Sequence, residues 1–239
     1  MGIMVYRDQA AASAAVATLV ASQLIEKPNS VLAVMASSRS LPIYRQLGAM
    51  TSAGILDWNE AEFFLTSEIL NPDNIGIFDS YISHYLYNEI GIPAGNVHAP
   101  RHNTQHVDDA CTAYEADIAS AGGVDLLLLP IESTAHLAYN LAGNSLTTLT
   151  HTQPLPSDIS EECRKNYSLS FQGNLQMITM GISTLMSAKR IVVCAFGSDM
   201  VKTTDGMLAE TVSTAKPLSL LQLHPSITFA LDEAAAAHL

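Results

Sequence analysis

The sequence predicts an α/β protein with a mainly parallel sheet and helices on both faces of that sheet. Short apolar β-type runs alternate along the chain with longer segments in which apolar residues recur at helical spacing. Such alternation is typical of βαβ units, which build parallel sheets. The run at 124–129 is apolar throughout after Asp125, as expected for a strand buried on both faces. Together these observations favour a Rossmann-like arrangement.

The predicted elements follow one another without a linker, so we expect a single domain over 1–239. In the first half, helices are predicted over 8–25, capped by Asp8, and over 41–50, 81–90 and 107–121. Strands are predicted over 31–35, 61–65 and 124–129. The second half predicts strands over 146–150, 175–179, 190–195 and 226–231, and helices over 182–188, 198–213 and 217–223. Loop-like composition marks 92–106 and 151–173, the latter long enough to be functional or partly mobile.

Composition limits the classes of function. The chain is 48% hydrophobic and 14% charged, which is enough for a sizeable core and too little charge for a disordered protein. The formal net charge is −12 and the basic residues form no stripe, so nucleic acid is not an expected partner. No apolar run reaches the roughly 20 residues of a membrane span, and the first residues show no signal-peptide pattern. Three scattered cysteines fit a reducing compartment, so we expect a cytoplasmic protein.

His136 is the first candidate for a functional residue. It follows the buried run 124–129 after a short turn, in a segment that begins like a helix. Ligands of α/β proteins bind at the carboxyl ends of the strands, and histidine can exchange protons near neutral pH. The competing interpretation is a structural histidine held by the fold.

Several short motifs can be compared with known proteins. The firmest are Thr179-Met180-Gly181-Ile182, the run 190–197 and Leu220-Leu221-Gln222-Leu223-His224-Pro225. Ser80-Tyr81 and the run 92–97 add to them, as does His136-Leu137-Ala138-Tyr139-Asn140. These motifs resemble the glucosamine-6-phosphate deaminase/6-phosphogluconolactonase family, an α/β group of sugar-phosphate enzymes. The histidine motif is similar to His-Ile-Ala-Phe-Asn of the deaminase/isomerase branch and unlike the lactonase motif. The resemblance implies a phosphorylated sugar or amino sugar as substrate, such as glucosamine- or galactosamine-6-phosphate, and no cofactor.

The loop that holds the sugar phosphate in this family matches in position and differs in content. Family deaminases have Gly-Gly-Thr/Ser-Pro after the first strand, and this chain has Ala36-Ser37-Ser38-Arg39-Ser40. Three hydroxyls and a guanidinium before a helix could still bind a phosphate, so Ser37, Ser38, Arg39 and Ser40 are candidate phosphate ligands. Alternatively, Ser38 or Ser40 only caps the next helix.

The acids of the family motifs are replaced. Where the family has Asp-Glu, with the Asp as the base that acts on C2 of the sugar, this chain has Ser67-Glu68. Glu68 is therefore a candidate base, and a solvated or helix-capping acid is the alternative. The two acids that flank the family histidine are Thr134 and Leu141 here. Glu132, four residues before His136, could supply a replacement carboxylate.

The phosphate-binding lysine of the family falls on Met200. Lys202 lies two residues further, about 200° around a helix, and is a candidate phosphate ligand only if the turn is remodelled. His98, His102 and His106 recur every four residues, but Pro100 favours a loop there and we expect no metal.

Two classes of function stay open at this stage. One is a sugar-phosphate enzyme with an altered active site, in which His136 acts in ring opening or proton transfer. The other is a catalytically inactive sugar-phosphate-binding or regulatory protein on the same fold, which the replaced acids favour. A homo-oligomer is an open alternative in both cases, and a closed pocket with a purely interfacial role is a third and weaker one.

Overall fold

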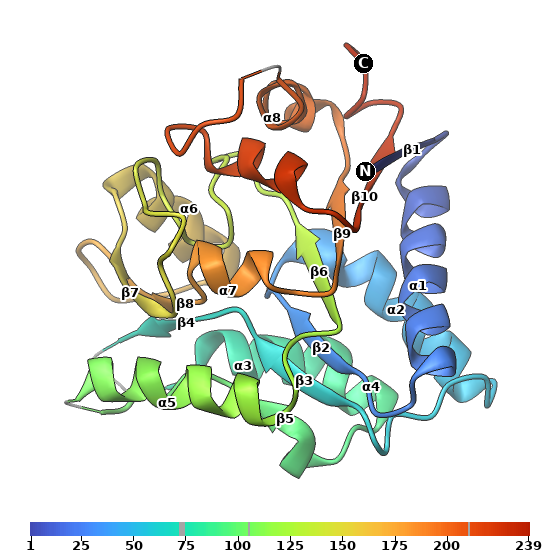
Figure 1. Cartoon of the computed structure of the whole chain (residues 1–239), viewed down its shortest axis with the longest axis horizontal. Coiled ribbons are helices and arrows are strands. Elements are labelled where there is room, and N and C mark those ends of the chain that lie inside the picture. The colour runs from blue at the N-terminus through green and yellow to red at the C-terminus, as the bar shows by residue number, and fades with distance from the viewer. Residues whose placement is uncertain (72–74, 105, 210) are drawn as a thin grey trace.

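The computed structural model describes residues 1–71, 75–104, 106–209 and 211–239. Its larger sheet has seven strands in the order β1-β10-β9-β6-β2-β3-β5, and every pair of neighbours in it is parallel. A smaller antiparallel sheet has the order β4-β8-β7 and lies on the opposite side of the molecule from β1 (Figure 1). The predicted α/β fold with a mainly parallel sheet is confirmed.

The strands and helices have the following bounds. The strands are β1 (Gly2–Tyr6), β2 (Val31–Val34), β3 (Glu62–Leu65), β4 (Ser67–Leu70), β5 (Val97–His98), β6 (Leu126–Pro130), β7 (His151–Pro154), β8 (Gln176–Thr179), β9 (Arg190–Ala195) and β10 (Ile227–Asp232). The helices are α1 (Gln9–Glu26), α2 (Leu41–Ser52), α3 (Ile77–Ile82), α4 (Asn88–Ile90), α5 (Val107–Ser120), α6 (Ser157–Tyr167), α7 (Ile182–Met186) and α8 (Val201–Met207). A π-helical segment (Ser83–Tyr87) joins α3 to α4, and short 3-10 helices cover Ser38–Ser40, Ala94–Asn96, Ser198–Met200 and Pro217–Leu223.

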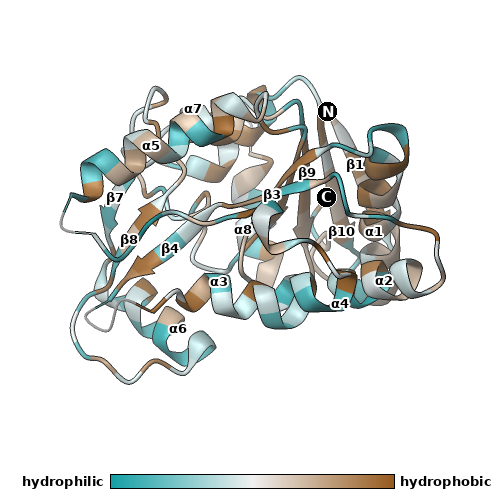
Figure 2. Cartoon of the chain, turned by 90° about the horizontal axis from the view of Figure 1, so that it is seen from below, coloured by the Kyte–Doolittle hydropathy of each residue, from teal (hydrophilic) through white to brown (hydrophobic). Residues whose placement is uncertain are grey.

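The core lies around the central strands of the larger sheet. All residues of β2 and β6 are buried, as are all of β9 except its first residue, which is the pattern of parallel strands covered on both faces. Figure 2 shows α5 and α7 on one side of the strands and α2, α3 and α4 on the other. In the same view the hydrophobic residues follow strands such as β9, whereas α6 is largely hydrophilic. Within the described residues, no helix combines the length and the apolar character that crossing a membrane requires.

Most predicted elements of the first half are present. Asp8 caps α1, because its Oδ1 accepts a hydrogen bond from the N–H of Ala11 at 2.8 Å. The helical region that begins at α3 ends at Gly91, whose positive φ of 68° glycine adopts without strain. The edge strand β1 was not predicted; its central residues Ile3, Met4 and Val5 form a short apolar run without alternation, and all three are exposed.

Several predictions for the second half are wrong. No strand covers 146–150; the strand is β7, whose residues His-Thr-Gln-Pro carry no apolar pattern. The predicted loop 151–173 therefore holds β7 and also α6, where Pro156 precedes the first helical turn instead of interrupting it. The helix predicted over 198–213 is limited to a 3-10 turn and α8, and the one over 217–223 is a 3-10 helix. Residue 210 of the first range, and residue 105 of the loop predicted over 92–106, lie outside the described residues.

Candidate functional site

The loops that follow β2, β6 and β9 meet at one edge of the larger sheet. These three strands are neighbours and parallel, so their carboxyl ends point the same way. The loops carry Arg39 after β2, Glu132 after β6 and Asp199 after β9. The carboxyl edge of a parallel sheet is the usual ligand-binding position in α/β proteins, and it holds most of the residues that the sequence singled out.

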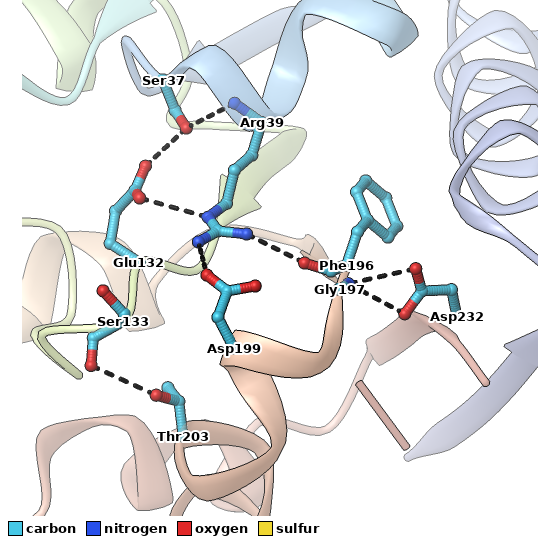
Figure 3. Close-up of polar contacts among 9 residues, drawn as sticks. All are labelled: Ser37, Arg39, Glu132, Ser133, Phe196, Gly197, Asp199, Thr203 and Asp232. Carbon is cyan, nitrogen blue, oxygen red and sulfur yellow. Dashed lines mark hydrogen bonds and ion pairs between the residues drawn. The ribbon is translucent and has the colours of Figure 1, made fainter. Parts of the chain in front are cut away.

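Arg39 is the centre of a polar network at this edge (Figure 3). Its Nε donates to Glu132 Oε2 at 3.2 Å, one Nη donates to Asp199 Oδ2 at 2.6 Å, and the other donates to the carbonyl of Phe196 at 2.8 Å. The Ser37 hydroxyl donates to the second oxygen of Glu132 at 2.5 Å. Two of the predicted phosphate ligands, Ser37 and Arg39, are thus bonded to carboxylates of the protein.

The other serines of this loop have separate positions. The Ser37 hydroxyl also accepts from the N–H of Arg39 at 3.1 Å and so caps the short 3-10 helix. Ser38 is exposed. Ser40 occupies the N-cap position of α2 without a capping bond from its side chain. The predicted side-chain cap of α2 by Ser38 or Ser40 is therefore absent, and the capping serine of this loop, Ser37, caps the 3-10 helix before α2.

His136 is buried, with 6% of its surface exposed, in a loop rather than in a helix. Its neighbours Ala135 and Ala138 have positive φ values of 59° and 49°, an uncommon conformation for residues other than glycine. The loop closes through two backbone hydrogen bonds between Leu137 and Asn140. The Asn140 side chain then donates to the carbonyls of Leu137 and Met180, which fastens the loop to the end of β8.

The environment of the imidazole fixes its tautomer. Nδ1 is bonded to the carbonyl oxygen of Ala138, which can only accept, so Nδ1 carries the hydrogen and Nε2 is the proton acceptor. The ring stacks on Tyr139 with a centroid distance of 4.8 Å. Burial lowers the pKa of His136 below its ordinary value, although the Ala138 carbonyl and the charge of Glu132 oppose the shift. The ring is therefore neutral near pH 7.

Glu132 and Glu68 are both placed away from direct contact with the imidazole. The Glu132 carboxylate accepts hydrogen bonds from Ser37 and Arg39, and its negative charge acts to raise the pKa of His136 without a hydrogen bond to the ring. Glu68 is fully buried, and its carboxylate accepts hydrogen bonds from the backbone N–H groups of Ile69, Ile77, Phe78 and Asp79 at 2.8–3.1 Å. Burial raises the pKa of Glu68, and the N–H groups oppose this. The geometry matches the predicted alternative of a helix-capping acid, here at the start of α3.

This role of Glu68 gives a first prediction. Glu68→Ala leaves three N–H groups of α3, one of them in a fully buried bond, and one buried N–H of β4 without this acceptor, so we expect the free energy of unfolding to fall by about 2 kcal/mol. Glu68→Gln, which keeps one acceptor oxygen, should lose about half as much. Urea unfolding measures both, with Glu89→Ala at an exposed position of α4 as the control. Wild-type stability in Glu68→Ala would show that the carboxylate does not hold α3.

One cavity of about 560 Å³ adjoins His136. It lies between the His136 loop, α6, α8 and the start of the last 3-10 helix. The lining residues are Thr134, Ala135, His136, Leu141, Ala142, Pro156, Ile159, Lys202, Thr203, Gly206, Met207, Ala215, Lys216, Pro217 and Leu218. A second gap beside His136, lined by residues that include Glu132, Tyr139 and Tyr167, has a volume of only about 10 Å³. The cavity is therefore the space available to a ligand beside the imidazole.

Lys202 and His136 both line this cavity. Lys202 was expected to face away because a regular α-helix would turn it by about 200° from Met200. The segment Ser198–Met200 is instead a 3-10 turn that precedes α8, so this rotation does not apply. Met200, at the family lysine position, is completely buried. Lys216, which the sequence did not single out, lies in the segment before the last 3-10 helix and lines the cavity as well. No motif surrounds it, so only the folded chain places it there.

The three histidines at 98, 102 and 106 have different surroundings. His98 pairs with Glu62 at 3.1 Å and stacks on Phe64. His106 lies just before α5. Across the described part of the chain, no three His, Cys, Asp or Glu residues are grouped as a metal ion would require.

Fold and site together define an α/β protein with a cavity, a candidate ligand site, at the carboxyl edge of a parallel sheet. The sequence model of the glucosamine-6-phosphate isomerases/6-phosphogluconolactonase family matches residues 7–229. The chain therefore belongs to this family.

Individual relatives agree with this assignment. The chain is 30% identical over 223 residues to a glucosamine-6-phosphate deaminase of Thermoanaerobacter pseudethanolicus, covering 92% of this chain and 88% of the relative. It is 31% identical over 239 residues to that of Rhodopirellula baltica, covering 99% and 95%.

Solved structures show the same fold. A monomeric glucosamine-6-phosphate deaminase superimposes with a TM-score of 0.93 at 24% identity, covering 99% of both chains. The 6-phosphogluconolactonase of Trypanosoma brucei does so with a TM-score of 0.78 at 19% identity, covering 100% of this chain and 98% of the other.

Proposed function

We propose that this chain binds a phosphorylated sugar or amino sugar, such as glucosamine- or galactosamine-6-phosphate, beside His136 and isomerises or deaminates it with an altered active site. The observation that carries the proposal is the neutral His136 imidazole, oriented by the Ala138 carbonyl, on the wall of a cavity of about 560 Å³. This volume lies in the range of small-molecule sites, roughly 300–1,000 Å³. The family membership supports a sugar phosphate as the substrate class.

The imidazole has the properties of a proton-transfer group. Because Nδ1 holds its hydrogen on the Ala138 carbonyl, Nε2 can accept a proton from a sugar hydroxyl and return it during ring opening or enolisation. Thr134 also lines the cavity, and its buried hydroxyl, which has no hydrogen-bond partner among the described residues, could bond to a sugar hydroxyl. The nearby carboxylate of Glu132 would stabilise the transient imidazolium through its charge.

A second candidate function is binding without turnover. The observation that favours it is the engagement of both candidate bases, Glu132 with Ser37 and Arg39, and Glu68 with the backbone of α3. Thermal stabilisation separates the two functions, since a ligand that binds the native state raises the unfolding temperature whether or not it reacts.

The test measures turnover and stabilisation together. If the chain is an enzyme, His136→Ala should reduce kcat by about 100-fold or more, because proton transfer contributes about 10²–10⁴-fold in such reactions. Ammonia release and the interconversion of aldose and ketose phosphates, followed by NMR, report the activity on a panel of hexosamine and hexose 6-phosphates. The matched control is His84→Ala, at an exposed position of the π-helical segment. Equal rates in wild type and His136→Ala would refute a catalytic His136, and stabilisation without turnover would establish the binding function instead.

A further inference from the structure

The cavity beside His136 has an unbalanced charge. The described residues that line it include Lys202, Lys216 and His136 but no Asp or Glu. Neither lysine forms an ion pair within the part of the chain that the structure describes. The rest of the lining is mainly apolar, with Leu141, Ile159 and other aliphatic side chains. A complementary ligand has an acidic group and an uncharged body.

The loop after β2 has the opposite character. Arg39 faces two carboxylates, Glu132 and Asp199, so the network carries one positive and two negative charges (Figure 3). The Glu132 carboxylate accepts from the Ser37 hydroxyl and from Nε of Arg39, the donors that an external anion would need. An incoming phosphate would have to displace a carboxylate whose side chain is only 14% exposed and leave it without these partners. Glu132 therefore acts as an internal anion at this loop.

We propose that the acidic group of the ligand binds at Lys202 and Lys216 instead of at Ser37 and Arg39. Within the proposed class of phosphorylated sugars, the cavity then favours phosphomonoesters whose body bears no positive charge. This inference rests on the proposed function for the sugar, and its anion-binding part stands without it. Both lysines are on exposed positions at the cavity, so their ammonium groups can adjust to a phosphate.

The charge of the lining also selects among amino sugars. A free amine at C2 is protonated near pH 7, and in this cavity it would meet two lysines and apolar side chains with no carboxylate to pair with. An acetamido or hydroxyl group at the same carbon has no charge to compensate. We therefore expect N-acetylglucosamine-6-phosphate and glucose-6-phosphate to bind about tenfold more tightly than glucosamine-6-phosphate.

Isothermal titration of the full chain tests the inference. The ligands are these three sugar phosphates, with phenyl phosphate and inorganic phosphate as probes of the anion site alone. The double variant Lys202→Ala/Lys216→Ala should weaken binding of the tightest ligand by about tenfold or more and reduce its salt dependence. The control Arg45→Ala/Lys165→Ala removes the same charge from exposed positions that do not line the cavity and should change Kd less than twofold. Ser37→Ala should leave Kd nearly unchanged.

The outcomes separate this inference from the proposed function. Lysine-dependent binding of phenyl phosphate without binding of any sugar phosphate would support the anion site and reject the proposed function. Sugar-phosphate binding that is weakened by Ser37→Ala and not by the lysine variant would overturn the anion site and leave the proposed function standing. Tighter binding of glucosamine-6-phosphate than of its N-acetyl form would refute the selection by charge. Absence of binding by every ligand would reject both proposals.

Discussion

Replacing Gly181 with alanine is expected to lower the free energy of unfolding by about 3 kcal/mol or more, because the added methyl group meets backbone atoms that cannot turn away. A Cβ at this position would lie 2.1 Å from the carbonyl oxygen of Thr148 and 2.2 Å from that of Leu149. Gly181 itself has an ordinary extended conformation, with φ −75° and ψ 171°. The requirement for glycine is therefore the close approach of the chain at 148–149 and not the backbone angles.

The same contact connects Gly181 to the His136 loop. The Thr148 carbonyl accepts the N–H of Ser183 at the start of α7, and the Met180 carbonyl accepts from the Asn140 side chain. Separating these segments would also loosen the anchor of the loop that carries His136. We thus expect Gly181→Ala to weaken ligand binding as well as stability, even though Gly181 does not line the cavity.

Gly48→Ala is the matched control for this change. Gly48 lies within α2, and a Cβ there would have the Glu89 Cβ as its neighbour at an ordinary 3.7 Å. Alanine in the interior of a helix is more favourable than glycine by roughly 0.5–1 kcal/mol, so this variant should be slightly more stable than wild type. Urea unfolding of both variants gives the two values, and an equal effect of the two would show that position 181 has no steric requirement.

The sequence contains enough information for the core of the fold. The run 124–129 is apolar without alternation because β6 is buried on both faces, and this pattern is local. Edge strands escape the same reasoning: β7 pairs at the edge of the small sheet through polar residues, and β1 is apolar but exposes most of its side chains. Their positions depend on partners far along the chain, β8 and β10, whose pairing no local pattern encodes.

The site could be predicted in position but not in its pairings. His136 and the loop after β2 lie where the strand ends place them. In contrast, Arg39 contacts Glu132 and Asp199, which are 93 and 160 residues away in sequence, and these contacts decide whether the guanidinium is available to a ligand. Glu68 resembles a catalytic acid in sequence because its motif does not reveal the helix start that it caps. Whether a candidate side chain is free to bind a ligand thus depends on contacts with residues far away in the sequence, which local motifs do not encode.

The second large effect is expected for Asp125, at the end of the sheet opposite to the cavity. Its side chain is 4% exposed. The carboxylate accepts hydrogen bonds from Lys27 Nζ at 2.6 Å, from Lys189 Nζ at 2.8 Å and from the N–H of Val31 at 2.8 Å. The carboxylate thus joins the starts of the neighbouring strands β2, β6 and β9. Asp125→Ala removes the acceptor of a buried N–H and of two ammonium groups, so we expect the free energy of unfolding to fall by about 3 kcal/mol.

This contribution should depend on pH. Burial alone would raise the pKa of Asp125, but the hydrogen bonds from Lys189, Lys27 and Val31 outweigh it, and the pKa in the folded protein lies below its ordinary value. A carboxyl group with a lowered pKa stabilises the fold above its unfolded pKa of about 3.9, and the stabilisation is lost as the pH falls through the folded value. The difference in stability between wild type and Asp125→Asn should therefore be largest at neutral pH and shrink below about pH 4.

Urea unfolding at several pH values between neutral and strongly acidic measures this difference. Asp117→Asn, at an exposed position of α5, removes the same charge without a buried partner and should change stability by less than about 0.5 kcal/mol throughout. A constant difference between wild type and Asp125→Asn across the acidic range would mean that the neutral form holds the three strands as well as the carboxylate does. The ammonium groups of Lys27 and Lys189 would then contribute to solubility alone, because they are half-exposed and can turn to solvent.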